Sequence, residues 1–405
     1  MTDMILIYDD EPGRVADWRE RLRSIPEVKQ SFEVQGVGDK EFIASFEELK
    51  ARRVRSRNAS SSVSGGDVAF DAASILVIDY DLLRIEHAGY LTGEAVAYLA
   101  RCYSGCGIIV GLNQYGDNIF DLTLRGHPES YADLNIGGSQ LHNRGLWLEP
   151  WSTFRPWQWP LLTAALEGLR SRIKSIEGRL DTSIVEHMQL SDNVVRTLPR
   201  AARDFVTKKS PVQEATFRAF ALDSAQGFKS RDKSPSDVQT ARVAAARLAQ
   251  WVEGFLLPGQ DILVDAPHLV YRYPSLLDGA ATNIDAWNQT AQLGGPKQSG
   301  VRHELIDRFA LPREWASRPV WSWIDVSTSE SIKEVKEPWS IRRPEWVFCE
   351  DLSRFLPQDA AREFVANVES PFARRHISNP QAEQVAHLRD ELLAVEYRPQ
   401  ERLYL

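Results

Sequence analysis

The sequence has few cysteines and no long apolar run, and both absences limit the classes of protein to consider. Only Cys102, Cys106 and Cys349 occur among 405 residues, so no disulfide framework is expected. The Cys-x3-Cys spacing has no companion pair and does not match a zinc site. No stretch approaches the ~20 apolar residues of a membrane-spanning helix, and the N-terminal MTDMILIYDD lacks a basic region. We therefore expect a reduced, cytoplasmic protein without a signal peptide or membrane span.

Basic residues are scarce in the first part of the chain. Residues 1–150 hold 23 Asp and Glu against 15 Lys and Arg, whereas residues 151–405 hold 33 of each. An acidic surface repels phosphate, so nucleic acid is not an expected partner there, but a cation would suit it. The mildly basic stretch from Arg196 to Lys233 is interpreted as a solvated helix face. No helix-turn-helix is evident downstream, which argues against a DNA-binding output.

Residues 1–180 alternate between short apolar runs and amphipathic segments. The apolar runs predict strands at Met4–Tyr8, Ser31–Val37, Ile75–Ile78, Gly107–Val110 and Gly145–Leu148. The other segments predict helices at 12–22, Glu41–Arg53, Thr92–Cys102, Asp117–Leu124 and Trp159–Leu180. Because strands that alternate with helices form parallel sheets, we expect an α/β fold with a doubly wound, five-stranded parallel sheet. Periodicity does not give the strand order.

Helical patterns dominate after Asp181, and we expect a second, mainly helical α+β domain over residues 181–405. Helices are predicted at Ala201–Val206, Val212–Gln226, Asp237–Leu256, Asp359–Val368 and Gln381–Val395. Short strands are predicted at Asp261–Val264, Val320–Ile324 and Trp346–Cys349.

Acidic residues stand at the ends of two predicted strands. Asp9 and Asp10 follow the first strand, and Asp79 ends the third in ILVIDYDLL. These strand ends are neighbours in a doubly wound sheet, so the three carboxylates should meet in one crevice. Carboxylates so close repel one another, and Mg²⁺, a hard cation that prefers oxygen ligands, would offset their charge. An Asp beside bound Mg²⁺ can accept a phosphoryl group.

The order of ILIYDDEP and ILVIDYDLL resembles the receiver domain of two-component response regulators. The resemblance covers roughly residues 1–180 and implies a flavodoxin-like fold in which a histidine kinase phosphorylates Asp79. It also implies that Asp9, Asp10 and Asp79 hold Mg²⁺, with Asp10 as the more direct ligand. The backbone carbonyl of Asp81 would complete the protein's share of the ligands.

Two positions depart from the receiver pattern. Receivers carry Ser or Thr at the end of strand four, where the nearest polar residue here is Asn113, whose amide can donate a hydrogen bond to a phosphoryl oxygen. Receivers also end strand five with Lys-Pro, and Glu149-Pro150 stands at that place here. An acid at the Lys position adds repulsion to a phosphate contact. Either a cation comes from elsewhere or stable phosphorylation is impaired.

Other candidate residues are better explained by structural roles. His187 faintly resembles the phosphorylatable histidine of a kinase, but no nucleotide-binding glycine motif follows it. Asp265 and His268 follow a predicted strand without a G-x-S-x-G or H-E-x-x-H motif, which favours a turn. The later tryptophans suit a core more than a ligand cage, and a docking surface is the alternative; they are Trp315, Trp321, Trp323, Trp339 and Trp346.

Three functions stay open from the sequence. The first is an atypical response regulator that signals through protein contacts near strand five, close to Trp147, Trp151 and Trp157, or acts as a phosphoryl sink. The second is an unphosphorylated pseudo-receiver that serves as an interaction scaffold, which Glu149 favours. The third makes the second domain an enzyme switched by the receiver, although no catalytic residues can be named for it.

Overall fold

The computed structural model describes most of the N-terminal half of the chain and short segments of the C-terminal half. The described residues are 2–57, 68–82, 91–113, 130–147, 160–223, 227–228, 235–257, 259–260, 263–265, 291–293, 313–315, 320–322, 326, 346–349, 354–364 and 375–378. Among the helices of these residues, none combines the length and the apolar character needed to cross a membrane.

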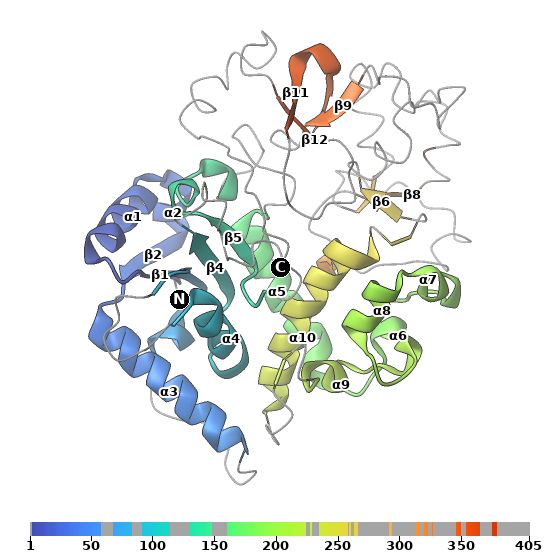
Figure 1. The fold of residues 1–405 in the computed structure, drawn as a ribbon, viewed down its shortest axis with the longest axis horizontal. Helices are drawn as coiled ribbons and strands as arrows, with labels where there is room; N and C mark the ends of the chain where they lie inside the picture. Colours follow the sequence, from blue (N-terminus) through green and yellow to red (C-terminus); the bar gives the residue numbers. More distant parts are fainter. Residues whose placement is uncertain are drawn as a thin grey trace.

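A five-stranded parallel sheet forms the centre of the N-terminal part (Figure 1). The strands lie in the order β2-β1-β3-β4-β5, and each neighbouring pair is parallel. They are β1 (Asp3–Tyr8), β2 (Phe32–Gly36), β3 (Ile75–Asp79), β4 (Ile108–Asn113) and β5 (Leu134–Gly137). This order with flanking helices fits a flavodoxin-like fold. The predicted α/β class with a five-stranded parallel sheet is confirmed.

Five helices accompany this sheet, and local sequence signals explain where two of them begin. They are α1 (Pro12–Ser24), α2 (Pro26–Ser31), α3 (Asp39–Arg57), α4 (Gly93–Tyr103) and α5 (Leu162–Ile176). Pro12 occupies the first turn of α1, where its missing N–H leaves no helical hydrogen bond unmade. Thr92 caps α4 by accepting a hydrogen bond from the Ala95 N–H at 3.3 Å. All five residues of β3 are buried, as expected for the central strand of a helix-covered sheet.

The predicted fifth strand is wrong. The apolar segment Gly145–Leu148 was expected to form it, but β5 is Leu134–Gly137, and Arg144–Leu146 forms a short 3-10 helix. Trp147 follows that helix and is 3% exposed, with its indole N–H donating to the Leu141 carbonyl at 3.2 Å. The segment is therefore apolar because it packs on the core. A short apolar run does not by itself distinguish a strand from another buried segment. The predicted helix Asp117–Leu124 lies outside the described residues.

Short helices and one long helix follow the sheet. They are α6 (Ile184–His187), α7 (Asp192–Thr197), α8 (Arg200–Val206), α9 (Phe217–Ala221) and α10 (Asp237–Trp251), which continues as a π-helical turn at Val252–Leu256. Single 3-10 turns lie at Ala69–Ala72, Gly138–Gln140, Glu177–Arg179, Val212–Glu214, Arg313–Trp315 and Gln358–Ala360. The long helix predicted over Val212–Gln226 is replaced by a 3-10 turn and α9.

The described C-terminal segments form two small sheets. The first has the order β6-β8-β7 and is antiparallel; its strands are β6 (Leu263–Asp265), β7 (Ala291–Leu293) and β8 (Val320–Ser322). The second has the order β10-β9-β12-β11; its strands are β9 (Trp346–Cys349), β10 (Arg354–Pro357), β11 (Ala361–Phe364) and β12 (Arg375–Ser378).

The helix predicted at Asp359–Val368 is wrong where the structure describes it. A 3-10 turn ends at Ala360, and the following residues form β11, which pairs with β12 in an antiparallel ladder. Strand pairing with a distant segment thus overrides the local helical pattern, because tertiary contacts outweigh weak intrinsic propensity. The predicted helix Gln381–Val395 lies outside the described residues.

Helix α10 packs directly against α4 and α5 (Figure 1). Its buried residues include Ala241, Ala244 and Leu248, each fully shielded from solvent. The hydrophobic core is continuous from the sheet into α10. The domain boundary expected near residue 181 stays a prediction, but the described helices beyond it share one core with the sheet.

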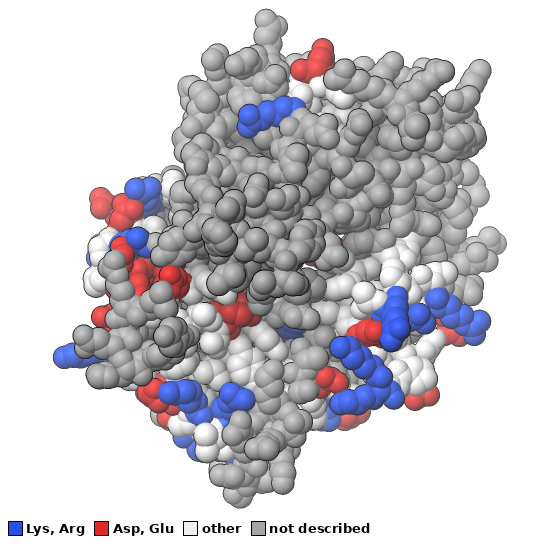
Figure 2. All heavy atoms as spheres, in the orientation of Figure 1, with Lys and Arg blue, Asp and Glu red and all other residues white. Residues whose placement is uncertain are grey.

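The charges on the exposed face follow the imbalance in the sequence. Asp and Glu atoms predominate around α1 and α2, whereas Lys and Arg atoms predominate over the region of α6 to α9 (Figure 2). The basic side chains of that region are partly neutralised by nearby acids. Arg200 pairs with Asp204, for example, with 3.3 Å between Nε and Oδ2.

Candidate functional site

Asp9, Asp10 and Asp79 come together at the carboxyl edge of the sheet. Each contributes a carboxylate oxygen, and these oxygens all lie within 4.8 Å of one another. Strands β1 and β3 bring them there, because Tyr8 pairs with Ile78, Asp9 follows Tyr8 and Asp79 follows Ile78. Asp9 and Asp79 are each 1% exposed, while Asp10 is partly exposed. The predicted meeting of the three carboxylates is confirmed.

The end of β1 is anchored just before the acidic pair. The Tyr8 ring stacks on Phe42 of α3 with centroids 3.5 Å apart, and its hydroxyl donates to Asp39 Oδ1 at 3.3 Å. Burial raises the pKa of Tyr8 above its usual range, and the carboxylates of Asp39, Asp10 and Asp9 raise it further. The phenol thus stays neutral beside the acids.

Asp9 lies in an environment that disfavours its charge. Burial raises the pKa of its carboxyl to about 6, and the nearby Asp10 and Glu11 raise it further. The Glu11 N–H, which donates to Asp9 Oδ1 at 2.6 Å, and the charge of Arg14 act in the opposite direction without cancelling the effect of burial. A cation at this place would therefore favour the ionised carboxylate.

The three carboxylates fit a hard divalent cation. Ligand oxygens about 2.1 Å from Mg²⁺ are separated by about 3 to 4 Å from one another, so small side-chain rotations would bring oxygens within 4.8 Å to that spacing. Carboxylate oxygens are the ligands that Mg²⁺ and Ca²⁺ prefer. The donor set thus supports a metal site formed by Asp9, Asp10 and Asp79.

Helix α4 begins against the backbone that follows Asp79. The Gly93 N–H donates to the Tyr80 carbonyl at 2.7 Å, and Asp81 forms an isolated antiparallel bridge with Thr92. A Cβ atom at Gly93 would lie 2.4 Å from the Asp79 carbonyl oxygen, closer than any side chain allows. Glycine is therefore required for this close approach. The predicted role of the Asp81 carbonyl as a metal ligand stays a prediction.

Asn113 lies at the same edge of the sheet as the acids. It ends β4, where it pairs with Gly137 of β5, and the preceding Leu112 pairs with Asp79. The backbone position therefore suits the residue that ends strand four in receivers. Its proposed contact with a phosphoryl group stays a prediction.

Because β5 lies elsewhere than predicted, the position that corresponds to the Lys of receivers also changes. Glu149 was assigned to it from a strand that the structure places elsewhere, and Glu149 and Pro150 themselves lie outside the described residues. Strand β5 ends at Gly137 and is followed by Gly138, Ser139 and Gln140. No Lys-Pro pair therefore follows the observed strand.

Arg14 is a cation near the acids that sequence reasoning missed. It lies in the first turn of α1, four residues after Asp10, and its charge lowers the pKa of Asp9. Its Nε also pairs with Glu11 Oε2 at 2.8 Å. The sequence did contain a signal, because a helix that begins directly after the acidic pair places its first turn beside them.

The remaining candidates whose side chains the structure describes are buried or pack against apolar neighbours. The His187 ring packs edge-on against Phe217 at 5.1 Å, and burial lowers its pKa. Trp315 and Trp321 are 1% and 5% exposed, which agrees with the core interpretation. Trp147, expected near an output surface, is buried instead. Trp151, Trp157 and His268 lie outside the described residues, and Asp265 ends β6.

Comparisons of the chain with family models, with curated proteins and with solved structures found no match. The resemblance to receiver domains therefore depends on the order of the strands and on the acids at their ends.

Proposed function

We propose that residues 1–180 form an atypical receiver that accepts a phosphoryl group on Asp79. The observation that carries this proposal is the convergence of Asp9, Asp10 and Asp79, with ligand oxygens within 4.8 Å, at the carboxyl edge of a β2-β1-β3-β4-β5 sheet. Ligands of open α/β sheets bind at this edge. The acids gather where a phosphoryl group could reach a carboxylate and a metal together.

In the proposed reaction, a carboxylate oxygen of Asp79 forms a bond to the phosphorus of the donor. The bond from phosphorus to the donor breaks at the same time, and for a phosphohistidine that bond is P–N. Bound Mg²⁺ would supply positive charge that offsets the charge of the phosphoryl oxygens. Asp9 and Asp10 would hold the metal, and the Asn113 amide would donate a hydrogen bond to the phosphoryl group.

The proposed partners are a cognate histidine kinase and a protein that recognises the phosphorylated form. The shortage of basic residues in residues 1–150 supports a protein rather than a nucleic-acid partner for the sheet. In a second version of this function, the chain competes with another receiver for phosphoryl groups and acts as a sink.

A pseudo-receiver is the second candidate function, and one observation favours it. The residues after β5 are Gly138, Ser139 and Gln140 rather than the Lys-Pro of receivers. Without that Lys, phosphoryl oxygens lose an attractive contact, and Arg14 is the described cation closest in sequence to the acidic pair. The chain would then serve as an interaction scaffold that binds metal but is not phosphorylated.

Incubation of the full chain with Mg²⁺ and acetyl phosphate, followed by intact mass measurement, separates these two functions. The receiver predicts a gain of one phosphoryl group that is absent without Mg²⁺ and absent in Asp79→Asn. Asp17→Asn, on the exposed side of α1, is the control and should be phosphorylated like the wild type. No gain with this donor or with a cognate kinase would favour the scaffold.

A further inference from the structure

The first turn of α4 contacts both the backbone beside the acidic site and the segment at residues 130–131. Gly93 lies against the backbone of Asp79 and Tyr80, and the next residue is Glu94. The Glu94 carboxylate accepts a hydrogen bond from Ser130 Oγ at 2.9 Å and one from the Tyr131 N–H at 2.5 Å. These two hydrogen bonds, one from a side chain and one from the backbone, fix this turn of α4 to residues 130–131.

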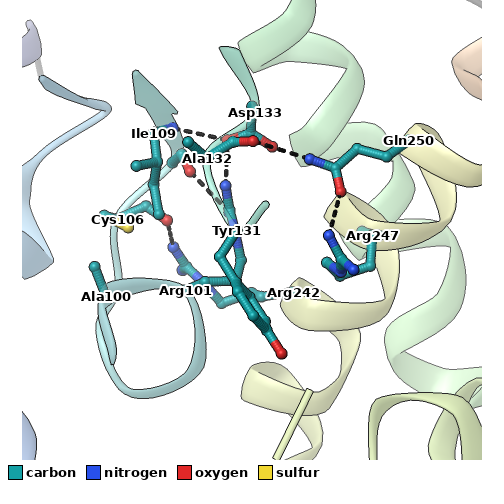
Figure 3. Close-up of polar contacts among 12 residues, drawn as sticks. Ala100, Arg101, Cys106, Ile109, Tyr131, Ala132, Asp133, Arg242, Arg247 and Gln250 are labelled. Atoms are coloured by element: carbon teal, nitrogen blue, oxygen red, sulfur yellow. Dashed lines mark hydrogen bonds and ion pairs between the residues drawn. The ribbon is translucent and has the colours of Figure 1, made fainter. Parts of the chain in front are cut away.

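Helix α10 also binds this segment. Arg247 donates from Nη1 to the Ser130 carbonyl at 2.5 Å, and Gln250 donates to the Ala132 carbonyl at 3.0 Å. The Arg247 guanidinium also lies over the Tyr131 ring, 4.9 Å from its centroid. Figure 3 shows Gln250 reaching from α10 toward the segment of Ala132 and Asp133 that precedes β5, with Arg247 beside Gln250. Residues 130–132 are thus held between Glu94 and α10.

The side chains around residues 130–132 are closely packed, so a shift of one of them should displace its neighbours. Arg247 is 1% exposed and Ser130 is 1% exposed, so their hydrogen bonds are made away from water. The Tyr131 ring packs edge-on against Tyr98 of α4, with centroids 5.0 Å apart. Packed interiors transmit small shifts instead of damping them. A movement of the first turn of α4 would therefore reach Arg247 through two hydrogen-bonded contacts.

A second arginine of α10 provides an internal comparison. Arg242 donates to the carbonyls of Gly105 and Cys106, which follow the C-terminal end of α4. Both arginines thus bind backbone carbonyls of the sheet part from the same helix. Of the two arginines, only Arg247 binds the segment that Glu94 contacts. Glu94 lies at the N-terminal end of α4, which is next to Asp79.

We propose that Glu94 and Arg247 couple the acidic site to α10, so that metal binding or phosphorylation at Asp79 and the packing of α10 regulate each other. The nature of the event at Asp79 rests on the proposed function, whereas the mechanical link rests only on the contacts above. Coupling between two sites is reciprocal, so a change in α10 must alter metal affinity by the same factor by which metal alters α10.

The first experiment tests the link in the full chain without metal. Amide hydrogen exchange is measured in the wild type, Arg247→Lys and Arg242→Lys, with EDTA present. Lysine keeps the charge but loses the fork of N–H donors. We expect faster exchange at residues 93–97 in Arg247→Lys but not in Arg242→Lys. Unchanged exchange in Arg247→Lys, or equal acceleration in both variants, would overturn the inference.

The second experiment measures Mg²⁺ affinity by calorimetric titration in these proteins and in Glu94→Gln, which keeps the shape of the side chain. We expect Kd for Mg²⁺ to rise at least threefold in Arg247→Lys and in Glu94→Gln, and to stay within 1.5-fold of wild type in Arg242→Lys. Equal affinity in all four proteins would overturn the coupling. If even the wild type binds no Mg²⁺, the proposed function fails, and the exchange experiment alone decides the link.

Discussion

The acidic edge of the sheet and the contact between α10 and the sheet both bury charge, but they do so with opposite partners. At the acidic edge, three carboxylates gather, and burial raises the pKa of Asp9 to about 6. At the α10 contact, the guanidiniums of Arg101, Arg242 and Arg247 bind backbone carbonyls, and Arg101 also pairs with Asp133 (Figure 3). The guanidiniums there lie against carbonyl and carboxylate oxygens, whereas the carboxylates at the acidic edge lie close to one another.

This difference is expected when one arrangement stabilises the fold and the other can hold an added cation. A buried charge that is paired and hydrogen-bonded holds the fold together, because the loss of either partner leaves the other unsatisfied. Like charges held together oppose folding, and their arrangement suits an ion that is added later. The two regions should therefore respond in opposite directions when one of their charges is removed.

The largest effect is expected at the ion pair of Arg101 and Asp133. Asp133→Asn keeps the shape of the side chain but removes the charge that compensates Arg101, whose side chain is 1% exposed. We expect a loss of about 3–5 kcal/mol in the free energy of unfolding, measured by urea denaturation. In the control Asp17→Asn, an exposed pair with Arg21 is removed, and the loss should stay below about 0.5 kcal/mol. Equal losses would contradict the comparison.

In contrast, Asp9→Asn without metal is expected to raise the free energy of unfolding. Between pH 3.8 and about 6 the unfolded chain releases the Asp9 proton while the folded protein keeps it, so stability falls as pH rises through that window. At 1.36 kcal/mol per pH unit, the cost at pH 7 is at most about 3 kcal/mol. We expect Asp9→Asn to be more stable than wild type at pH 7 and equal to it near pH 3. Denaturation in EDTA across this range measures the difference.

Added Mg²⁺ should reverse the disadvantage of the acidic edge. At a concentration of about 100 times its Kd, Mg²⁺ would raise the free energy of unfolding by about 2.7 kcal/mol. Asp10→Asn removes one ligand of the cluster and should lose most of this gain, while the Asp133→Asn protein should keep it. A gain that survives in Asp10→Asn would place the metal elsewhere.

The smallest effects are expected from two glycines that differ in their surroundings. Alanine at Gly93 would press against the backbone of Asp79, at a cost of about 1–3 kcal/mol. Alanine at Gly13, in α1, meets nothing within 4 Å and should stabilise by up to about 1 kcal/mol. Thermal denaturation compares the two variants, and Mg²⁺ titration of Gly93→Ala should show weaker binding.

The acids could be predicted from sequence because a strand end is a local signal. The run ILVI before Asp79 and the run before Asp9 each indicate a buried strand, and parallel pairing brings their ends together. The fifth strand could not be predicted in the same way. Leu134–Gly137 is short and includes Asn135, whereas the more apolar segment ending at Trp147 packs on the core without forming a strand.

Glu94 and Arg247 could not be predicted as partners either. They are separated by more than 150 positions and meet through backbone groups of residues 130–131, together with the Ser130 hydroxyl and the Tyr131 ring. The same holds for β11, which pairs with β12 although its local sequence pattern predicted a helix. Contacts made through distant backbone atoms depend on the whole fold, and local patterns do not record them.

The shared core has a practical consequence for anyone who would cut this chain into modules. A fragment that stops at residue 180 lacks α10, so the carbonyls of Ser130, Ala132 and Gly105 would lose their protein donors, and the face of Tyr131 would be open to water. Such a fragment would expose these carbonyls and this ring beside β5, the edge strand of its sheet, where other molecules could bind them. Chemistry measured on it would describe a protein with a disrupted core, so experiments on the acidic edge need the full chain.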